Sequence, residues 1–489
     1  MAEARSFFAR RGVVAAMLLA ALLLAAACPP AGAAPTTIVN NGPSSNRVDI
    51  VFLGDGYTAA NHLAGTYDAH INGFVDYMFD SEYSDPFPRY ANFFNIHKIV
   101  TNSAQSGADI PNATPPVSRQ TFFHASYETA LGDPYDPDDP NDRLLVLDEG
   151  LAHLVRTSEL GGTGITADMK LMSVNSNKYG GSGGVTAAFA GANAFSYELG
   201  MHEMAHSWVD LADEYGGDAT PYAGAEPTEV NVTTDPAGAK WAHWAGFDDP
   251  RRFTLDITTQ QGGRYFDSGI YRPSFDSKMR TVHNEPPRHY DAVSREQFIL
   301  KIYEFVNPLD AFKPGSSVTD EPLWVDVIDP EVIKVEWFVD HTLVPGATGE
   351  TFHPADYGFG PGTYEVTANA YDEAMEHAFQ GGMLDLVRTN LSTLHQYVEW
   401  TLTVSDPADF DESGVVDQDD YELWVNKFGG PSPPWWGNRD GLVEAADYTV
   451  WRDAFSGRRA LGAAGVPEPG ALGLAALAIV ALAAGRRRR

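Results

Sequence analysis

The chain has 489 residues, of which 44% are hydrophobic, and this length favours two or more domains over one compact core. Its 46 glycines and 32 prolines are typical of loop-rich globular domains and argue against a disordered chain. The 33 lysines and arginines face 66 aspartates and glutamates, and a net charge of −33 disfavours binding to nucleic acid or anionic lipid. A surface this acidic suits a protein that meets calcium outside the cell.

Residues 1–34 have the parts of a secretory signal peptide. Arginines at 10–11 precede an apolar run at 13–27, and the small residues 31–33 offer a cleavage site. The alternative is a lipoprotein signal that carries its lipid on Cys28, the only cysteine of the chain. Because the processed protein then has no free cysteine, no disulfide holds it together, and its stability must come from core packing and bound metal.

Strands and helices alternate over the first half of the chain, which predicts an α/β layer. The predicted strands are Val48–Leu53, Phe93–Val100 and Lys170–Val174, and the predicted helices are Thr58–Phe79 and about Phe195–Leu211.

A glycine-rich segment at residues 179–184 follows the third of these strands. It could offer an exposed strand edge to which an extended substrate adds as another strand. A plain surface hairpin is the alternative.

The predicted helix at about 195–211 contains the run His202-Glu203-Met204-Ala205-His206. Residues four apart lie on one face of a helix, so both histidines can reach one zinc ion. Glu203 lies beside them, where it can handle the protons of a metal-bound water. Chance and a buried structural pair of histidines are the alternatives, and the flanking apolar helix and acidic run favour the zinc site.

A catalytic zinc needs a third protein ligand and an open position for water. Asp210 continues the same helical face, but eight residues of helix rise about 12 Å, which is too far from His202. The chain must therefore turn back first, which favours Asp213 over the alternative Glu214. No proline or glycine lies between His206 and Gly216, so the sequence does not say where the helix ends.

The segment at 323–404 alternates apolar and polar residues in short runs between glycine and proline turns, which predicts a small Ig-like β-sandwich. An internal repeat follows at 409–457, in which an acidic loop with a central glycine precedes a short amphipathic helix in each half. This spacing predicts calcium loops, and a solvated acidic turn is the alternative for each.

The first loop is complete and the second is degraded, since Trp436 occupies its first ligand position. The predicted ligands of the first loop are Asp409, Asp411, Ser413, Val415 (through its carbonyl), Asp417 and Asp420. Those of the second loop are Asn438, Asp440, Glu444 and Asp447. The paired loops resemble a dockerin-type module, which implies a cohesin-like partner, and a calcium-stiffened spacer is an equal alternative.

The chain ends with Val-Pro-Glu-Pro at 466–469, an apolar run at 471–484 and arginines at 486–489. The run is short for a membrane helix, and the arginines would hold its end on the cytoplasmic side. The pattern resembles the PEP-CTERM sorting signal of Gram-negative bacteria. That resemblance implies transient membrane anchoring, processing by sorting machinery, and release to the cell surface or matrix.

The first half of the chain resembles the IgA peptidase family of zinc metallopeptidases, which belongs with the metzincin-like enzymes. The resemblance covers roughly residues 36–312 and rests on the stretches VDIVFLGDGYT, VNSNKYGGSGG, HEMAHSWVDLADEY, GIYRPSFDSKMR and SREQF. It implies zinc on His202 and His206, an acidic third ligand in Asp213, Glu203 as general base, and a turn at Met279 beneath the metal. In the common metzincin spacing the third ligand would fall on Ala212 and the helix-breaking glycine on Val209, so the register is one residue longer here.

These features predict a multidomain, exported zinc endopeptidase that hydrolyses a protein or peptide substrate. Tyr271, Arg280 and His283 are candidates to stabilise the oxyanion. The alternatives are an inactive surface adhesion or matrix protein, which has no reason to keep Glu203, and hydrolysis of a non-peptide amide. The predicted parts are a signal peptide (1–34), a metzincin-like α/β peptidase domain (35–312), an all-β sandwich (313–404), an α-helical calcium module (405–458), a linker (459–465) and a sorting tail (466–489).

Overall fold

The computed structural model describes residues 33–128, 142–282, 286–375, 385–433 and 435–459. The predicted signal peptide up to residue 32, with Cys28, the sorting tail and His283 lie outside the described residues. The chain forms two compact units. Unit 1 comprises Met1–Asp310, Val327–Lys334 and Ala370–Gln396, and unit 2 comprises Ala311–Asp326, Val335–Asn369 and Tyr397–Arg489.

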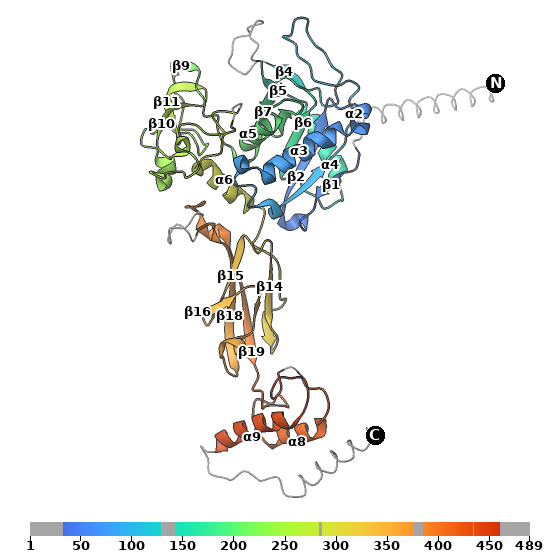
Figure 1. Cartoon of the computed structure of the whole chain (residues 1–489), viewed down its shortest axis with the longest axis vertical. Coiled ribbons are helices and arrows are strands. Elements are labelled where there is room, and N and C mark those ends of the chain that lie inside the picture. Colours follow the sequence, from blue (N-terminus) through green and yellow to red (C-terminus); the bar gives the residue numbers. More distant parts are fainter. Residues whose placement is uncertain (1–32, 129–141, 283–285, 376–384, 434, 460–489) are drawn as a thin grey trace, which may run out of the picture. The chain divides into compact units, whose positions relative to one another are not determined.

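An eight-stranded mixed sheet with the order β1-β3-β2-β6-β8-β7-β5-β4 forms the centre of unit 1 (Figure 1). Every residue of β2 (Val48–Asp55) is buried, as expected for a strand that is covered on both faces. It pairs in parallel with β3 (Phe94–Lys98) and β6 (Met169–Val174), and β8 (Ala187–Ala190) continues the parallel series beyond β6. The remaining strands are β1 (Thr36–Val39), β4 (Ser126–Glu128), β5 (Leu144–Val146) and β7 (Gly181–Ser182).

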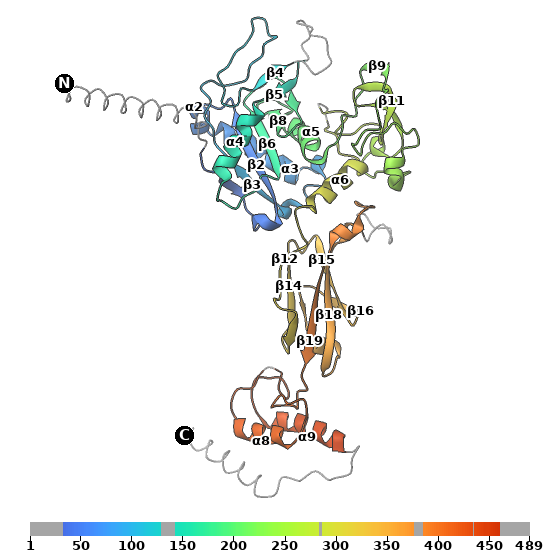
Figure 2. The same ribbon diagram turned by 180° about the vertical axis from the view of Figure 1, so that it is seen from behind.

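Helices cover both faces of this sheet (Figure 1, Figure 2). The side chains of β2 alternate between the two faces, so successive residues pack against different helices. On one face, Phe74 of α3 (Thr66–Asp80) meets Phe52 edge-on at 5.7 Å between ring centroids. On the other face, α4 (Glu149–Leu160) packs Ala152 and Val155 into a cluster that includes Val51 and Leu53. The predicted α/β layer is therefore confirmed as a mixed α/β fold.

The predicted helix at 58–79 is in fact two helices, α2 (Ala59–Leu63) and α3. Gly65 separates them with a φ of 72°, a conformation that glycine adopts without steric cost. Thr58 caps α2 by accepting a hydrogen bond from the backbone N–H of Asn61. The error arose because the apolar spacing continues across the break.

The metal-motif helix is α5 (Ser196–Val209), which packs against β8, α3 and α6 (Ala292–Ile302). After α5 the chain is largely irregular, with the 3₁₀ helix η4 (Ala239–Trp244) and a small three-stranded sheet of order β10-β11-β9. The strands of this sheet are β9 (Asp218–Pro221), β10 (Gln260–Gly263) and β11 (Phe266–Arg272).

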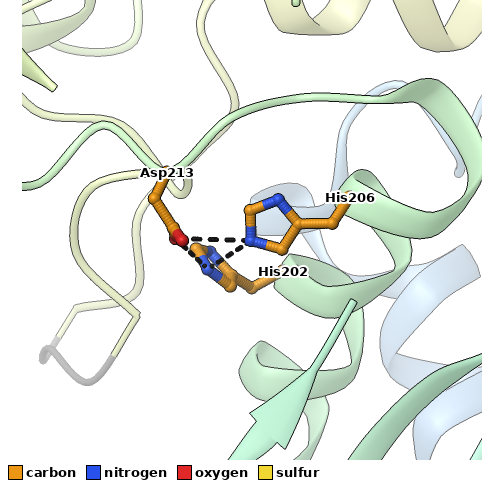
Figure 3. A group of neighbouring side chains, drawn as sticks. All are labelled: His202, His206 and Asp213. Atoms are coloured by element: carbon orange, nitrogen blue, oxygen red, sulfur yellow. Dashed lines mark hydrogen bonds and ion pairs between the residues drawn. The ribbon is translucent and has the colours of Figure 1, made fainter. Parts of the chain in front are cut away.

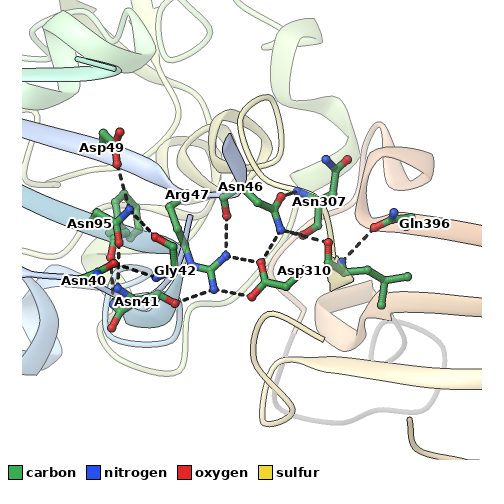
Figure 4. A network of polar contacts seen from close by, with 12 residues as sticks. Asn40, Asn41, Gly42, Asn46, Arg47, Asp49, Asn95, Asn307, Asp310 and Gln396 are labelled. Atoms are coloured by element: carbon green, nitrogen blue, oxygen red, sulfur yellow. Dashed lines mark hydrogen bonds and ion pairs between the residues drawn. The ribbon is translucent and has the colours of Figure 1, made fainter. Parts of the chain in front are cut away.

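A polar network joins the loop before β2 to the chain that leaves α6, and all of it lies within unit 1 (Figure 4). The Asn46 amide donates to the carbonyl oxygens of Asn307 at 3.2 Å and Leu309 at 3.1 Å, and it accepts from the backbone N–H of Asn307 at 2.7 Å. Leu309 N–H in turn donates to the side chain of Gln396 at 2.9 Å. These bonds hold the segment 307–310 against the loop before β2.

Two further segments from beyond residue 310 belong to unit 1. Asp372, in Ala370–Gln396, is fully buried and accepts hydrogen bonds from the hydroxyls of Tyr90 at 2.6 Å and Tyr303 at 2.9 Å. The residues of the predicted β-sandwich, 313–404, therefore belong partly to unit 1 and partly to unit 2. The predicted domain boundaries stay a prediction.

The predicted β-sandwich region forms a five-stranded sheet and a three-stranded sheet. In unit 2 the fully buried ring of Trp337 stacks on Phe352 at 5.1 Å and on Trp400 at 5.9 Å. The five-stranded sheet has the order β13 (Ser317–Thr319), β19 (His395–Val404), β18 (Gly362–Asp372), β15 (Ile333–Val339) and β16 (Thr342–Thr348). The other sheet has the order β12 (Leu309–Phe312), β14 (Leu323–Val327) and β17 (Thr351–Phe352).

The repeat region has two helices, α8 (Gln418–Lys427) and α9 (Ala445–Arg459), each preceded by one of the acidic loops. Trp424 of α8 donates from Nε1 to the carbonyl oxygen of Glu444 at 2.9 Å. Trp451 of α9 donates to the carbonyl oxygen of Asp417 at 2.8 Å. Each tryptophan thus binds the loop of the other repeat, at equivalent positions. Across the part of the chain that the structure describes, no helix has both the length and the apolar character that a membrane span requires.

Candidate metal centre

His202 and His206 lie one turn apart on α5 and face the same side of the helix. His202 is buried and His206 is partly buried, with their rings perpendicular at 4.7 Å between centroids. This is the arrangement that the four-residue spacing predicts.

Asp210 ends the helix and turns the chain back. Its φ of 54° is left-handed, a conformation that aspartate adopts more readily than most residues other than glycine. Its N–H donates to the carbonyl oxygen of Ala205, which closes the helix end. The helix therefore ends after Val209, without a glycine, and Asp213 returns toward the histidines.

The side chains of His202, His206 and Asp213 converge on one point (Figure 3). Nε2 of His202 lies 2.9 Å from Oδ1 of Asp213 and 3.1 Å from Nε2 of His206, and the third side of the triangle is 3.3 Å. Ligand bonds of about 2.0–2.1 Å in a tetrahedral zinc site place ligand atoms about 3.3 Å apart. The three atoms therefore fit a single small metal ion.

Both histidines are oriented by backbone carbonyls. Nδ1 of His202 lies 3.0 Å from the carbonyl oxygen of Lys278, and Nδ1 of His206 lies 2.5 Å from that of Leu211. With Nδ1 donating to these oxygens, Nε2 of each ring is left as the atom that can bind a metal. Two such acceptor nitrogens face each other favourably only with a cation or a proton between them.

Asp213 is buried, which by itself disfavours its ionised form, but His206 and His202 outweigh that effect and hold the pKa of its carboxyl well below the usual range. Its second oxygen, Oδ2, accepts a hydrogen bond from the hydroxyl of Tyr265 at 2.5 Å. The carboxylate thus presents Oδ1 to the two histidines.

Glu203 follows His202 on α5 and is also buried. Burial raises the pKa of its carboxyl, although the neighbouring histidines act in the opposite direction. A carboxylate with a raised pKa is better suited to accept and release a proton than one with an ordinary pKa.

The glycine-rich segment passes directly against the motif. A Cβ atom at Gly181 would lie 2.6 Å from Oε1 of Glu203, and one at Gly183 would lie 2.2 Å from Cβ of His206. The glycines are required because a side chain at either position would displace the site. The expectation of a free strand edge is wrong for Gly181–Ser182, because β7 pairs with β5 on one side and with β8 on the other.

The motif residues lie in an open cleft of about 1060 Å³. The exposed side chain of Arg143 lines this cleft, with its guanidinium 5.1 Å above the ring of Tyr215. Arg143 and Tyr265 carry hydrogen-bond donors that sequence reasoning missed, because nothing local to them marks their position beside α5. Tyr271 and Arg280 are not among the described residues that line the cleft.

Glu214, the alternative third ligand, does not join the triangle. Its buried carboxyl accepts hydrogen bonds from Asn231 at 3.0 Å and from the hydroxyl of Ser277 at 2.6 Å. Burial, followed by the charge of Asp291, raises the pKa of Glu214 to about 8. The backbone N–H of Glu214 donates to the carbonyl oxygen of the fully buried Met279, which lies in a turn, so this turn contacts the segment that carries Asp213.

The first acidic loop of the repeat brings Asp409, Asp411 and Asp420 together, with ligand atoms within 4.8 Å of one another. Ser413 N–H donates to Oδ1 of Asp409, and Asp417 N–H donates to Oδ2 of Asp420. The hydroxyl of Ser413 lies 3.2 Å from the carbonyl oxygen of Val415. Asp411 accepts from Ser413 N–H and donates its own N–H to Asp420, so all six predicted ligands of the first loop are linked by hydrogen bonds to other predicted ligands.

The second loop has a similar backbone but fewer carboxylates. Asp447 is buried and accepts from the N–H groups of Asn438 at 2.9 Å and Glu444 at 2.7 Å, and Asn438 donates to Asp440. Trp436 packs against Phe410 in the core of the module. The side chain at the first position of the second loop therefore offers no oxygen ligand.

The sequence model of the family described as IgA Peptidase M64 matches residues 36–253. This match supports the resemblance of residues 36–253 to the IgA peptidase family. It indicates a peptidase, and therefore a hydrolase that acts on a protein or peptide substrate. The matched region contains the His202–His206 helix and Asp213, together with Arg143 and Glu203. No match to the chain was found among curated proteins.

Proposed function

We propose that this protein is an exported zinc-dependent endopeptidase whose metal ligands are His202, His206 and Asp213. The observation that carries the proposal is the triangle of ligand atoms, 2.9–3.3 Å on a side, in an open cleft beside Glu203. Two imidazoles and one carboxylate form a donor set that zinc prefers, and the cleft leaves a fourth position open to water. The match to a peptidase family supports peptide bonds as the target.

In the proposed mechanism the metal ion and the protein side chains have separate roles. A zinc ion bound here supplies a Lewis acid that polarises the scissile carbonyl and lowers the pKa of a water molecule. Glu203 accepts the proton of the attacking water and delivers it to the leaving amine. The guanidinium of Arg143, which lines the same cleft, would stabilise the oxygen that gains negative charge, in place of the sequence-based candidates Tyr271 and Arg280, which do not line it.

The test is the variant Glu203→Ala in the processed protein. We expect it to keep one zinc per chain, because no ligand is changed, and to lose hydrolysis of a protein mixture by about 10²–10⁴-fold or more. Zinc content by elemental analysis is the internal control for an intact site. If the variant cleaves as well as the parent, Glu203 is not the base. Retention of Glu203 in the cleft also disfavours an inactive adhesion protein.

We further propose that the repeat module binds calcium, chiefly in its first loop. Support comes from the clustered oxygens of Asp409, Asp411 and Asp420, since calcium prefers carboxylate and carbonyl ligands. The module then serves as a calcium-stiffened spacer or as a dockerin-like partner for a cohesin-like domain.

We also propose export and surface sorting, on the strength of the two terminal sequences alone. The processed protein would be anchored transiently in the membrane of a Gram-negative-type bacterium and then released. Mass spectrometry of the mature protein tests this, because it would start near residue 34 and end before the arginines at 486–489.

A further inference from the structure

The third ligand of the proposed metal site is held by a strained hairpin. Strands β10 and β11 pair Gly263 with Phe266, so the loop between them consists of Arg264 and Tyr265 alone. Both loop residues are left-handed, with φ values of 49° and 72°. Two-residue hairpin loops with this geometry usually carry asparagine and glycine, because other side chains meet steric cost there.

Three backbone hydrogen bonds offset this cost and pin the hairpin tip onto the segment after α5. Arg264 N–H donates to the carbonyl oxygen of Asp213 at 2.7 Å, and Tyr265 N–H donates to that of Tyr215 at 2.9 Å. The carbonyl oxygen of Tyr265 accepts from the N–H of Asp218 at 2.7 Å. The left-handed conformation of both residues therefore places the tip against the main chain of the metal ligand itself.

The side chain of Tyr265 completes the arrangement. Its hydroxyl donates to Oδ2 of Asp213 at 2.5 Å, while Oδ1 of Asp213 lies 2.9 Å from Nε2 of His202. The rings of Tyr265 and Tyr215 pack in a T-shaped arrangement with 5.2 Å between their centroids, which restricts the rotation of Tyr265. The two carboxylate oxygens thus have different partners, one a phenol and the other the metal-facing histidines.

We propose that Tyr265 is a positioning residue that makes Asp213 a one-oxygen ligand. By occupying Oδ2, the phenol prevents the carboxylate from binding the metal with both oxygens and keeps a coordination position free for water. The inference rests on the proposed function, in that a metal ion occupies the triangle of His202, His206 and Asp213.

The test is Tyr265→Phe, which removes the hydroxyl and keeps the ring against Tyr215. Zinc affinity is measured on the processed protein by competition with a chromophoric chelator, and we expect it to fall by about 10- to 100-fold. The cobalt(II)-loaded variant should show weaker visible absorption than the parent, because a carboxylate that binds through both oxygens raises the coordination number.

Two further variants separate positioning from general structure. Tyr222→Phe removes a hydroxyl that donates to the carbonyl oxygen of Ala225 at 2.8 Å and accepts from Arg264 at 3.2 Å but does not bond to Asp213, and it should leave zinc affinity and the cobalt spectrum unchanged. Arg264→Gly relieves the left-handed strain at the tip while keeping the phenol, and it should bind zinc as the parent does. Thermal melts of the metal-free proteins report any loss of fold.

Parental zinc affinity and an unchanged cobalt spectrum in Tyr265→Phe would overturn the inference while leaving the proposed function intact. A change of the same size in Tyr222→Phe would also overturn it, since the effect would then be one of fold. Absence of stoichiometric zinc from the parent protein would instead remove the proposed function.

Discussion

The guanidinium of Arg47 binds the carboxylate of Asp310 through two parallel hydrogen bonds, Nη1 to Oδ1 and Nη2 to Oδ2, both 2.6 Å long. Nη2 of Arg47 also donates to the carbonyl oxygen of Asn41, and a Cβ atom at Gly42 would lie 2.5 Å from the guanidinium. The pair joins the start of β2 to the last residue of the first segment of unit 1 (Figure 4).

Removing the acidic partner should destabilise unit 1. Arg47 is almost fully buried, so Asp310→Ala leaves a buried cation without its counter-charge, and we expect a loss of about 3 kcal/mol in the free energy of unfolding. Urea denaturation followed by circular dichroism measures it. Lys334→Ala, which removes a partly exposed cation that donates to the backbone carbonyls of Pro330 and Glu331, is the control and should change stability by less than about 0.5 kcal/mol.

The same pair predicts acid sensitivity. Burial alone would raise the pKa of Asp310, but hydrogen bonds from Arg47 and Asn46 outweigh it and lower the pKa. A carboxyl with a lowered folded-state pKa stabilises the protein above its unfolded value of about 3.9, and this contribution is lost as the pH falls through the folded value. The stability difference between the parent and Asp310→Asn should therefore shrink below about pH 4. A difference that stays constant down to pH 2 would contradict this assignment.

Glycine at position 183 should be essential to the site. Gly183→Ala places a methyl group against Cβ of His206, and overpacking of this kind costs about 1–3 kcal/mol or displaces α5. We expect reduced zinc affinity and strongly reduced peptide hydrolysis. Gly184→Ala is the matched control, because a Cβ atom there meets no atom within 4 Å. Equal activity of the two variants would show that Gly183 does not constrain the proposed metal ligands.

Metal removal should affect stability as well as activity. Zinc present at 100 times its dissociation constant stabilises the folded state by about 2.7 kcal/mol, so a chelator should lower the melting temperature and abolish hydrolysis, and added zinc should restore both. Glu203→Ala should show the same melting shift, since its ligands are intact. Asp213→Ala should show little or none, and a full shift in that variant would move the third ligand elsewhere.

Calcium binding is predicted to depend on Asp411. This exposed carboxylate is the third position of the first loop, and Asp411→Ala should weaken calcium binding by at least about tenfold in titration calorimetry of the processed protein. Asp419→Ala removes an exposed carboxylate of the same segment that is not a loop ligand, and it should bind calcium normally. Calcium binding that is weakened equally in both variants would indicate a diffuse acidic surface.

The sequence predicted best what depends on local periodicity. The buried run of β2 and the histidine pair on α5 follow from spacing, and the need for the chain to turn back favoured Asp213 over Asp210. The site of that turn was not predictable, because Asp210 adopts a left-handed conformation for which neither glycine nor proline gives a signal.

The remaining parts of the site depend on long-range packing. Tyr265 reaches Asp213 only because a hairpin distant in sequence folds onto the ligand segment, and Arg143 reaches the cleft because its strand neighbour Leu144 pairs with Gly181. The packing of the glycine-rich segment is also long-range. Nothing in the sequence shows that Gly181 packs on Glu203 or that Gly183 packs on His206.

The reciprocal hydrogen bonds of Trp424 and Trp451 make the two halves of the repeat module depend on each other. Each half of the repeat supplies an indole N–H that donates to a backbone carbonyl oxygen of the other half. Deleting either half would therefore leave one such carbonyl and one indole without their hydrogen-bond partners. The second loop, which has a tryptophan in its first position, therefore serves as a scaffold for the first loop. This structural role does not require it to bind an ion.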